Sequence, residues 1–225
     1  MASQARSAFD KNSEDILRLL EIHEGAGGNA RGRRYRLEVL NKSAIVLITA
    51  FWEAYCEDLA SEAVEHLVKH AKSADNIPLE LRKAIAKETE AAEHQLEVWK
   101  LADDGWRAYM TARLQKMKES RDRKLNTPKT EQIDALFFEA LGIKKVSSSW
   151  SWKRMTVANA SKKLNEFVEL RGVIAHRGKN NKSVTKAQVT AYFEHVKRLA
   201  GKTGGRVNTF VWKSVGKPLW SRKSR

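Results

Sequence analysis

The chain has 225 residues, enough to bury one sizeable hydrophobic core, and its single cysteine, Cys56, excludes an intrachain disulfide and a cysteine-based zinc cluster. The first residues lack the apolar segment of a signal peptide, and the longest apolar run, Ala44 to Trp52, is too short to cross a bilayer, so we expect a cytoplasmic protein without a membrane partner. The net charge of +15 lies in the last third, because residues 1–141 hold 22 Lys and Arg against 24 Asp and Glu, whereas residues 142–225 hold 20 against 3.

Helices are predicted almost throughout, because the chain has only three prolines and long runs of Ala, Leu, Glu and Lys. The expected fold class is therefore all-α. A first helix is predicted from about Ser13, which would cap it, to the glycine-rich break at 25–28. A second helix is predicted from about Arg33 to His70, and its wide apolar face makes it the expected spine of a helical bundle.

Residues 79–125 are predicted to form one or two further helices, with a break at 103–105, as an insertion on the bundle. A short helix follows over Thr130–Leu141, ended by Gly142, and the Ser-rich segment 144–154 is expected to lie outside the core. The last two helices are predicted over 157–176 and 185–199. The chain is thus expected to be one domain over 1–200, followed by a basic aromatic tail over 201–225 that forms a short strand or an arm.

One arginine of the 157–176 helix stands out by its position. Arg171 falls in register with the apolar stripe, three and four residues after Val168 and Phe167. A permanently charged group on a packing face has to be accounted for by a buried carboxylate, a phosphate or a second copy of the chain. His176 lies about 140° further round an ideal helix, so the two side chains meet only if the helix ends by His176 or if a second protomer supplies its own pair.

The Arg-x4-His spacing is weak evidence by itself, because it occurs twice in this chain. The other match, Arg18 and His23, is an internal control. Arg18 is predicted on the polar face of the first helix, with Glu14 and Glu21 at helical spacing as surface partners. That match looks accidental, whereas Arg171 lies on a packing face within the basic last third.

Two segments carry a resemblance to a known family. Leu170-Arg-Gly-Val-Ile-Ala-His-Arg-Gly178 resembles the Arg-x4-6-His signature near the end of HEPN domains. The predicted helix from Asn41 to Leu59 resembles an earlier helix of the RiboL-PSP-HEPN branch, with its apolar run followed by aromatic, Glu, aromatic, acidic and Leu positions. The resemblance covers roughly residues 33–70 and 155–200.

The resemblance implies a helical bundle that pairs as a homodimer and cuts RNA without a metal or another cofactor. Many relatives are toxins or effectors in defence systems, which implies an antitoxin or regulatory partner and RNA, tRNA included, as substrate. In the family pattern a polar residue, commonly Asn, follows the Arg. Gly172 stands there in this chain.

The chemistry of RNA cleavage suits these residue types, because RNA supplies its own nucleophile, the 2′-hydroxyl. His176 would act as general base or acid, and Arg171 would hold the phosphate oxygens, leaving a 2′,3′-cyclic phosphate and a 5′-hydroxyl. Arg177 would add a phosphate contact. By family analogy Glu53 lies on the facing helix and orients Arg171 or His176; a salt bridge with a surface lysine is an equally good explanation for this carboxylate.

Aromatic residues flanked by cations are a second candidate for RNA contact. Aromatic rings beside cationic side chains form the usual platform for single-stranded bases, but docking of the rings onto the bundle is an equal alternative. The candidate RNA-binding residues are Lys144, Lys145, Trp150, Trp152, Lys153, Arg154 and Lys179. No metal site is expected, because His66 and His70 stand one helical turn apart without the glutamate of a metalloprotease motif.

Two hypotheses follow from these observations. The first is a metal-independent endoribonuclease with Arg171 and His176 as its catalytic pair. The second is a non-catalytic module that binds RNA or a protein, in which Arg171 is a structural ion-pair residue; Gly172 is its best motivation. A DNA-binding role has less support, because the sequence shows no clear helix-turn-helix.

Overall fold

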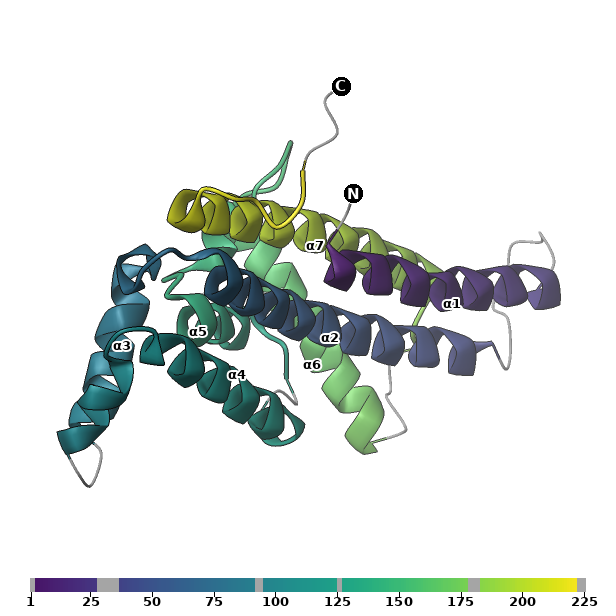
Figure 1. Ribbon diagram of the computed structural model, residues 1–225. Coiled ribbons are helices and arrows are strands. Elements are labelled where there is room, and N and C mark those ends of the chain that lie inside the picture. The colour runs from purple at the N-terminus through teal and green to yellow at the C-terminus, as the bar shows by residue number, and fades with distance from the viewer. Residues whose placement is uncertain (1–2, 28–36, 92–94, 125–126, 178–182, 222–225) are drawn as a thin grey trace.

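The computed structural model describes residues 3–27, 37–91, 95–124, 127–177 and 183–221 (Figure 1). In these ranges the chain forms seven α-helices and three short 3-10 helices, labelled η, and no strand. In chain order they are α1 (Gln4–Gly27), α2 (Glu38–His70), η1 (Ala74–Asn76), α3 (Leu79–Glu90), η2 (Gln95–Leu101), α4 (Gly105–Lys124), α5 (Thr130–Leu141), η3 (Val146–Ser149), α6 (Val157–Arg177) and α7 (Lys186–Val215). The prediction of an all-α fold is confirmed.

Helix α2 is the spine of the molecule, as its apolar pattern predicts. It packs against α1, α4, α5, α6 and α7, and α1 and α7 run beside it along the long axis (Figure 1). The centre of the core is aromatic: Trp52 of α2 is fully buried, and its ring lies 5.9 Å from that of Trp150 and 6.1 Å from that of Tyr55. Because α2 is covered on several sides, side chains from its middle turns lie at the junction of several helices.

The bounds of α1 differ from those predicted. The helix begins at Gln4 and continues past Gly25 to Gly27. Ser13 does not cap it, because its hydroxyl donates to the carbonyl of Phe9 inside the helix. Ala5, Phe9 and Ile16 are buried against the bundle, so tertiary packing extends the helix at the N-terminal side of the expected cap.

The predicted insertion consists of α3, η2 and α4 and lies at the end of the molecule where α2 ends (Figure 1). The predicted break at 103–105 is confirmed, since η2 ends at Leu101 and α4 starts at Gly105. Arg107 of α4 donates to the carbonyls of Val68 and Ala71, at the end of α2. This side chain satisfies carbonyls that have no partner within the helix and fixes the insertion to the spine.

The segment 144–154 is not outside the core, contrary to the prediction from its Ser-rich composition. Val146 and Trp150 have no exposed surface, and Ser147 is buried. The backbone N–H and the hydroxyl of Ser147 both donate to the carboxylate of Asp134 in α5. The serines thus satisfy polar groups of a segment that inserts an aromatic ring into the bundle.

Helix α7 runs 16 residues beyond the predicted end at Leu199, to Val215. It starts with a capping box between Thr185 and Gln188, and it passes through three glycines, Gly201, Gly204 and Gly205. A Cβ at Gly204 would lie 2.7 Å from the hydroxyl of Tyr55. This glycine therefore permits close packing of α7 on α2 instead of ending the helix. The non-helical tail begins only at Gly216, and its described residues form no strand.

The residues that follow α7 fold back along it. Asn208 donates to the carbonyl of Trp220 and accepts from its backbone N–H. None of the helices in the described ranges is long and apolar enough to cross a membrane.

Candidate functional site

Arg171 lies where the sequence pattern places it, on the packing stripe of α6. Leu164 and Val168, earlier on the same stripe, are buried, and Arg171 is partly buried with its Nε atom out of contact with solvent. The guanidinium of an arginine keeps its charge in proteins. The site therefore has one fixed positive charge at the edge of the core.

Glu53 of α2 carries a charge within electrostatic reach of Arg171. The pKa of Glu53 is raised to about 7, mainly by burial and also by the nearby carboxylate of Glu57, while the positive charge of Arg171 opposes both effects. A carboxyl group with a pKa near 7 is present in both protonation states at neutral pH. The predicted placement of Glu53 on a helix facing Arg171 agrees with this coupling, and Glu53 can take up or release a proton there.

A buried hydroxyl pair completes the surroundings of Arg171. The Oγ1 of Thr49 lies 2.9 Å from the hydroxyl of Tyr192, and Thr49 donates its own proton to the carbonyl of Ile45. Because a threonine hydroxyl has one proton, Tyr192 is the donor between the two. Burial raises the pKa of Tyr192 and the charge of Arg171 opposes this, so the tyrosine, too, lies within the field of Arg171.

The neighbourhood of Arg171 thus draws on three helices: α2 with Thr49 and Glu53, α6 with Arg171 itself, and α7 with Tyr192. The sequence pattern singled out only two of these four residues. Tyr192 looks like an ordinary core residue of α7, and Thr49 lies within an apolar run, so neither carries a signal of its own.

His176 does not share a face with Arg171 in one chain. Helix α6 continues through Arg177, so positions 171 and 176 stay about 140° apart around its axis. The helix therefore does not end before His176 in this structure, and a second protomer is the other way in which the pair could meet. The side chains of His176 and Arg177, and the whole of Lys179, lie outside the described residues.

A basic groove of about 620 Å³ lies on the N-terminal side of Arg171 along α6. Its lining residues are Arg154, Met155, Asn159, Lys162, Lys163, Glu166, Phe167, Leu170 and Gln188. Phe167 connects the groove to the Arg171 neighbourhood, because its ring stacks on Tyr192 with centroids 4.2 Å apart. Of the candidate RNA-binding residues that the structure describes, only Arg154 lines this groove. Lys162 and Lys163 were not predicted from the sequence as RNA-binding residues.

The other candidate RNA-binding residues are distributed unevenly. Lys144, Lys145 and Lys153 are exposed, and Lys144 forms an ion pair with Glu80 at 3.4 Å. Trp150 is fully buried, and its indole N–H donates to the hydroxyl of Thr203 at 2.8 Å. An RNA base cannot stack on this ring. Of the two alternatives for Trp150, base stacking and docking onto the bundle, the structure shows docking.

Trp152 is partly buried and packs beside a histidine that was not among the predicted functional residues. Its ring centroid lies 5.5 Å from that of His195 of α7, whose Nε2 lies 3.0 Å from the carbonyl oxygen of Ala160. Burial lowers the pKa of His195 to about 4, so the ring is neutral at physiological pH and donates to that carbonyl. His195 is a packing residue that fixes α6 against α7.

The two histidines considered for metal binding have another neighbour. His66 and His70 lie with their rings 4.3 Å apart, and the Nε2 of His66 lies 3.1 Å from the carbonyl oxygen of Lys217. Within the described residues no third His, Cys, Asp or Glu joins them in a group that could hold a metal ion.

Comparison with known proteins assigns the chain to a family. Residues 11–204 match the model of the RiboL-PSP-HEPN family. A search of curated proteins and a search of solved structures each find no significant match. HEPN domains are commonly ribonucleases or RNA-binding modules, and they often dimerise. Since the match spans most of the chain, with both helices of the Arg171–Glu53 pair inside it, this protein belongs to the RiboL-PSP-HEPN family.

Proposed function

We propose that this protein is a metal-independent endoribonuclease with Arg171 and His176 as its catalytic residues. The observation that carries the proposal is the position of Arg171: a permanent cation with a buried Nε, coupled to Glu53 and Tyr192, at the end of a basic groove. Family membership alone supports a nuclease or an RNA-binding module. The charged residue at the edge of the core favours the nuclease.

The proposed reaction needs only proton transfer and charge stabilisation. His176 takes the proton of the 2′-hydroxyl, the 2′-oxygen bonds to phosphorus, and the bond from phosphorus to the 5′-oxygen breaks. The 5′-oxygen takes up a proton from the protonated imidazole of a second histidine or from water, which leaves a 2′,3′-cyclic phosphate and a 5′-hydroxyl. Arg171 holds the phosphate oxygens as their charge grows, and Glu53 orients Arg171.

The basic groove along α6 supports a path for the RNA strand up to Arg171. Arg154, Lys162 and Lys163 line it together with Phe167, whose ring stacks on Tyr192. Phosphates attract such cations regardless of base sequence. Arg177, Lys144, Lys145, Lys153 and Lys179 are proposed to add backbone contacts outside the groove, with Trp152 at its margin.

A second copy of the chain is proposed to complete the site. The argument is the continuous helix α6, which keeps positions 171 and 176 on different faces, together with the apolar surface beside them. Val173 is 38% exposed, and Ala175 is exposed as well. Pairing of two chains through this end of α6 would cover that surface and bring the Arg171 of one chain toward the His176 of the other.

Cleavage of RNA by purified variants tests the proposal. Wild type is expected to cut total RNA or tRNA in EDTA and to leave cyclic-phosphate ends, whereas Arg171→Ala and His176→Ala are expected to lose at least about 100-fold in rate. Arg18→Ala is the matched control, because it breaks the other Arg-x4-His match at an exposed position of α1 and should retain full activity. Growth arrest on expression of wild type alone would point to a toxin or defence effector.

The second candidate function, a binding module without catalysis, is favoured by Gly172. A Cβ at this position would meet no atom within 4 Å, so packing around Cβ does not require glycine where the family pattern has a polar residue. Wild-type protein that binds RNA in a filter assay but leaves every lane of the gel intact would reject the nuclease and support this alternative.

A further inference from the structure

A cavity of about 390 Å³ lies beside the C-terminal part of α7. It forms where the tail after Gly216 folds back along the helix (Figure 1). The lining residues are Asn208, Thr209, Trp212, Pro218 and Trp220. Two of them are tryptophans, and none is charged. A volume of this size lies in the range of cavities that hold small ligands, about 300–1,000 Å³.

Hydrogen bonds and close packing hold the tail against α7. The side chain of Asn208 donates to the carbonyl of Trp220 at 3.2 Å and accepts from the backbone N–H of the same residue at 3.3 Å. The indole ring of Trp220 lies against Gly204, since a Cβ at that glycine would be 3.5 Å from its Cη2 atom. This wall of the cavity is therefore in place before any ligand arrives.

Trp212 forms the side of the cavity that is open to solvent. It follows Gly204 and Asn208 at intervals of four residues, so the three positions lie on one face of α7. Trp212 is 53% exposed, whereas Trp220 is partly buried. A half-exposed indole beside an uncharged cavity offers a flat apolar surface to a planar ligand.

Cations border this cavity. Arg206 and Lys213 lie three residues before and four residues after Thr209, so they share its face of the helix, and both are exposed. Lys217 is exposed as well and directly precedes a residue of the lining. No ion pair with a carboxylate of the described residues is found for any of the three. Residues 195–225 contain no Asp or Glu, so the border of the cavity is positive.

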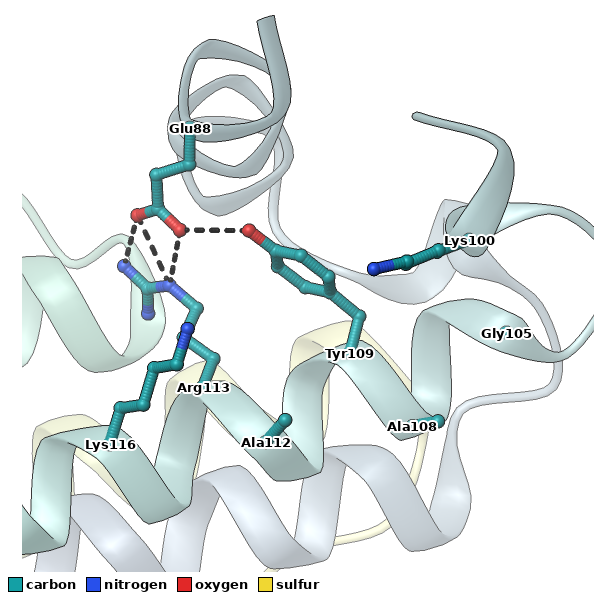
Figure 2. Close-up of a pocket in the computed structure, with 8 residues that line it drawn as sticks. All are labelled: Glu88, Lys100, Gly105, Ala108, Tyr109, Ala112, Arg113 and Lys116. Atoms are coloured by element: carbon teal, nitrogen blue, oxygen red, sulfur yellow. Dashed lines mark hydrogen bonds and ion pairs between the residues drawn. The ribbon is translucent and has the colours of Figure 1, made fainter. Parts of the chain in front are cut away.

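The larger cavity of the predicted insertion lacks this combination. It has about 510 Å³ between α3, η2 and α4, and the hydroxyl of its aromatic residue, Tyr109, donates to Glu88 (Figure 2). The same carboxylate accepts from Arg113 at 3.0 Å. A negative charge thus lies in the wall of that cavity, whereas the lining beside α7 is uncharged and its border is basic. The cavity beside α7 is the one suited to an anionic strand with planar bases.

We propose that the cavity beside α7 binds an unpaired base of a single-stranded nucleic acid. The base stacks on the indole of Trp212, beside Trp220. Phosphates next to that base contact the bordering cations Arg206, Lys213 and Lys217. Aromatic rings beside cationic side chains are the usual arrangement for binding single strands without sequence preference. The cations lie outside the lining, so contact with them favours a strand over a free nucleoside.

This cavity is separate from the site around Arg171. Tyr192, the residue of α7 next to that site, precedes Trp212 by 20 residues, which is about 30 Å along a helix that rises about 1.5 Å per residue. Binding at Trp212 uses none of the residues near Arg171 and does not depend on cleavage.

Fluorescence anisotropy of the full chain with two labelled strands of equal length tests this inference. One strand is a 2′-O-methyl oligouridylate, which has no 2′-hydroxyl and cannot be cut by the proposed reaction. The other has the same sugar–phosphate backbone without bases. Both strands carry the same charge, so the difference in their affinities measures base stacking. We expect wild type to bind the strand with bases at least about fivefold more tightly.

Variants assign this preference to Trp212. Trp212→Ala should bind both strands equally, with the affinity that wild type has for the strand without bases, and Trp212→Phe should retain part of the preference because it keeps an aromatic face. Trp99→Ala is the matched control, because it removes a 72% exposed tryptophan of η2 and should leave the preference unchanged. Arg206→Ala combined with Lys213→Ala should weaken the binding of both strands alike and reduce its dependence on salt.

Arg171→Ala should keep the preference of wild type, so failure of the proposed ribonuclease and failure of this site can be distinguished. Circular dichroism checks that each variant is folded, which we expect for Trp212→Ala because the residue is half exposed. Equal binding of the two strands by wild type would overturn the inference and favour an apolar peptide segment as the occupant. A preference for bases that persists in folded Trp212→Ala would overturn it as well.

Discussion

At the scale of single residues, Glu53 predicts a dependence of stability on pH. Its pKa is raised to about 7, mainly by burial, so between about pH 4.5 and 7 the folded protein holds a proton that the unfolded chain releases. The stabilisation from protonated Glu53 is complete below its unfolded pKa and is lost as the pH rises through 7. The free energy of unfolding of Glu53→Gln, relative to that of wild type, should therefore rise by about 1–2 kcal/mol from pH 5 to pH 8, with allowance for partial exposure.

Urea unfolding of both proteins at the two pH values measures this difference. Arg171 supplies the control, because its charge lowers the pKa of Glu53. In an Arg171→Gln background the loss of stability should extend to higher pH and be larger, because the folded pKa of Glu53 rises while its unfolded pKa does not change. A difference between wild type and Glu53→Gln that is the same at pH 5 and pH 8 would show that the carboxyl group is not perturbed.

The residue scale also shows what a sequence pattern can detect. Arg171 could be identified from the sequence because it is a charged residue at a position where the helical spacing predicts an apolar one. Thr49 and Tyr192 fit the helical pattern around them, so the sequence does not single them out. Only the packing of α2 against α7 brings their hydroxyl oxygens within 2.9 Å of each other. The prediction for the segment 144–154 shows the opposite error. Its serines and lysines indicate an exposed loop, whereas the indole N–H of Trp150 donates to a buried hydroxyl on α7.

At the scale of elements, the glycines of α7 predict opposite effects of the same substitution. Gly204→Ala would place a Cβ 2.7 Å from the hydroxyl of Tyr55, which donates to the carbonyl of Ala200 at 2.8 Å. The tyrosine ring cannot easily move, because it is buried against Phe9 and Trp52. We expect a loss of about 1–3 kcal/mol in the free energy of unfolding.

Gly205→Ala is the matched control for this prediction. A Cβ there meets no atom within 4 Å, so alanine should stabilise the helix by about 0.5–1 kcal/mol through its lower backbone entropy in the unfolded chain. Denaturant unfolding of both variants distinguishes the cases. Equal effects at the two neighbouring positions would mean that close packing against Tyr55 is not what requires glycine at 204.

The same glycines explain why the end of α7 was predicted 16 residues too early. Gly201, Gly204 and Gly205 lower the local helix propensity, and a glycine after an apolar stripe usually marks a helix end. Packing of the helix on α2 outweighs this preference, since Val207 and Val211 beyond the glycines have no exposed surface. By contrast, α5 ends as predicted at Gly142, whose φ of 75° a residue with a side chain rarely adopts.

At the scale of the whole molecule, the uneven charge corresponds to a division of the fold. The spine α2 and the insertion belong to the near-neutral first 141 residues, whereas α6, α7 and the groove beside Arg171 belong to the strongly basic remainder. Both the all-α class and this division follow from composition and periodicity. Composition does not determine whether the side chains at two positions of one helix come together, because that depends on where the helix ends and on what packs against it.

Mixing two inactive variants tests whether the proposed site is shared between two chains. If Arg171 of one protomer works with His176 of the other, a heterodimer of Arg171→Ala and His176→Ala has one intact site and one site that lacks both residues. Random exchange between equal amounts would make half of the dimers heterodimers and restore about a quarter of wild-type cleavage. Each variant alone should remain inactive. If both residues of a site come from one chain, no mixture regains activity, and α6 would then have to unwind before Arg177 for the pair to meet.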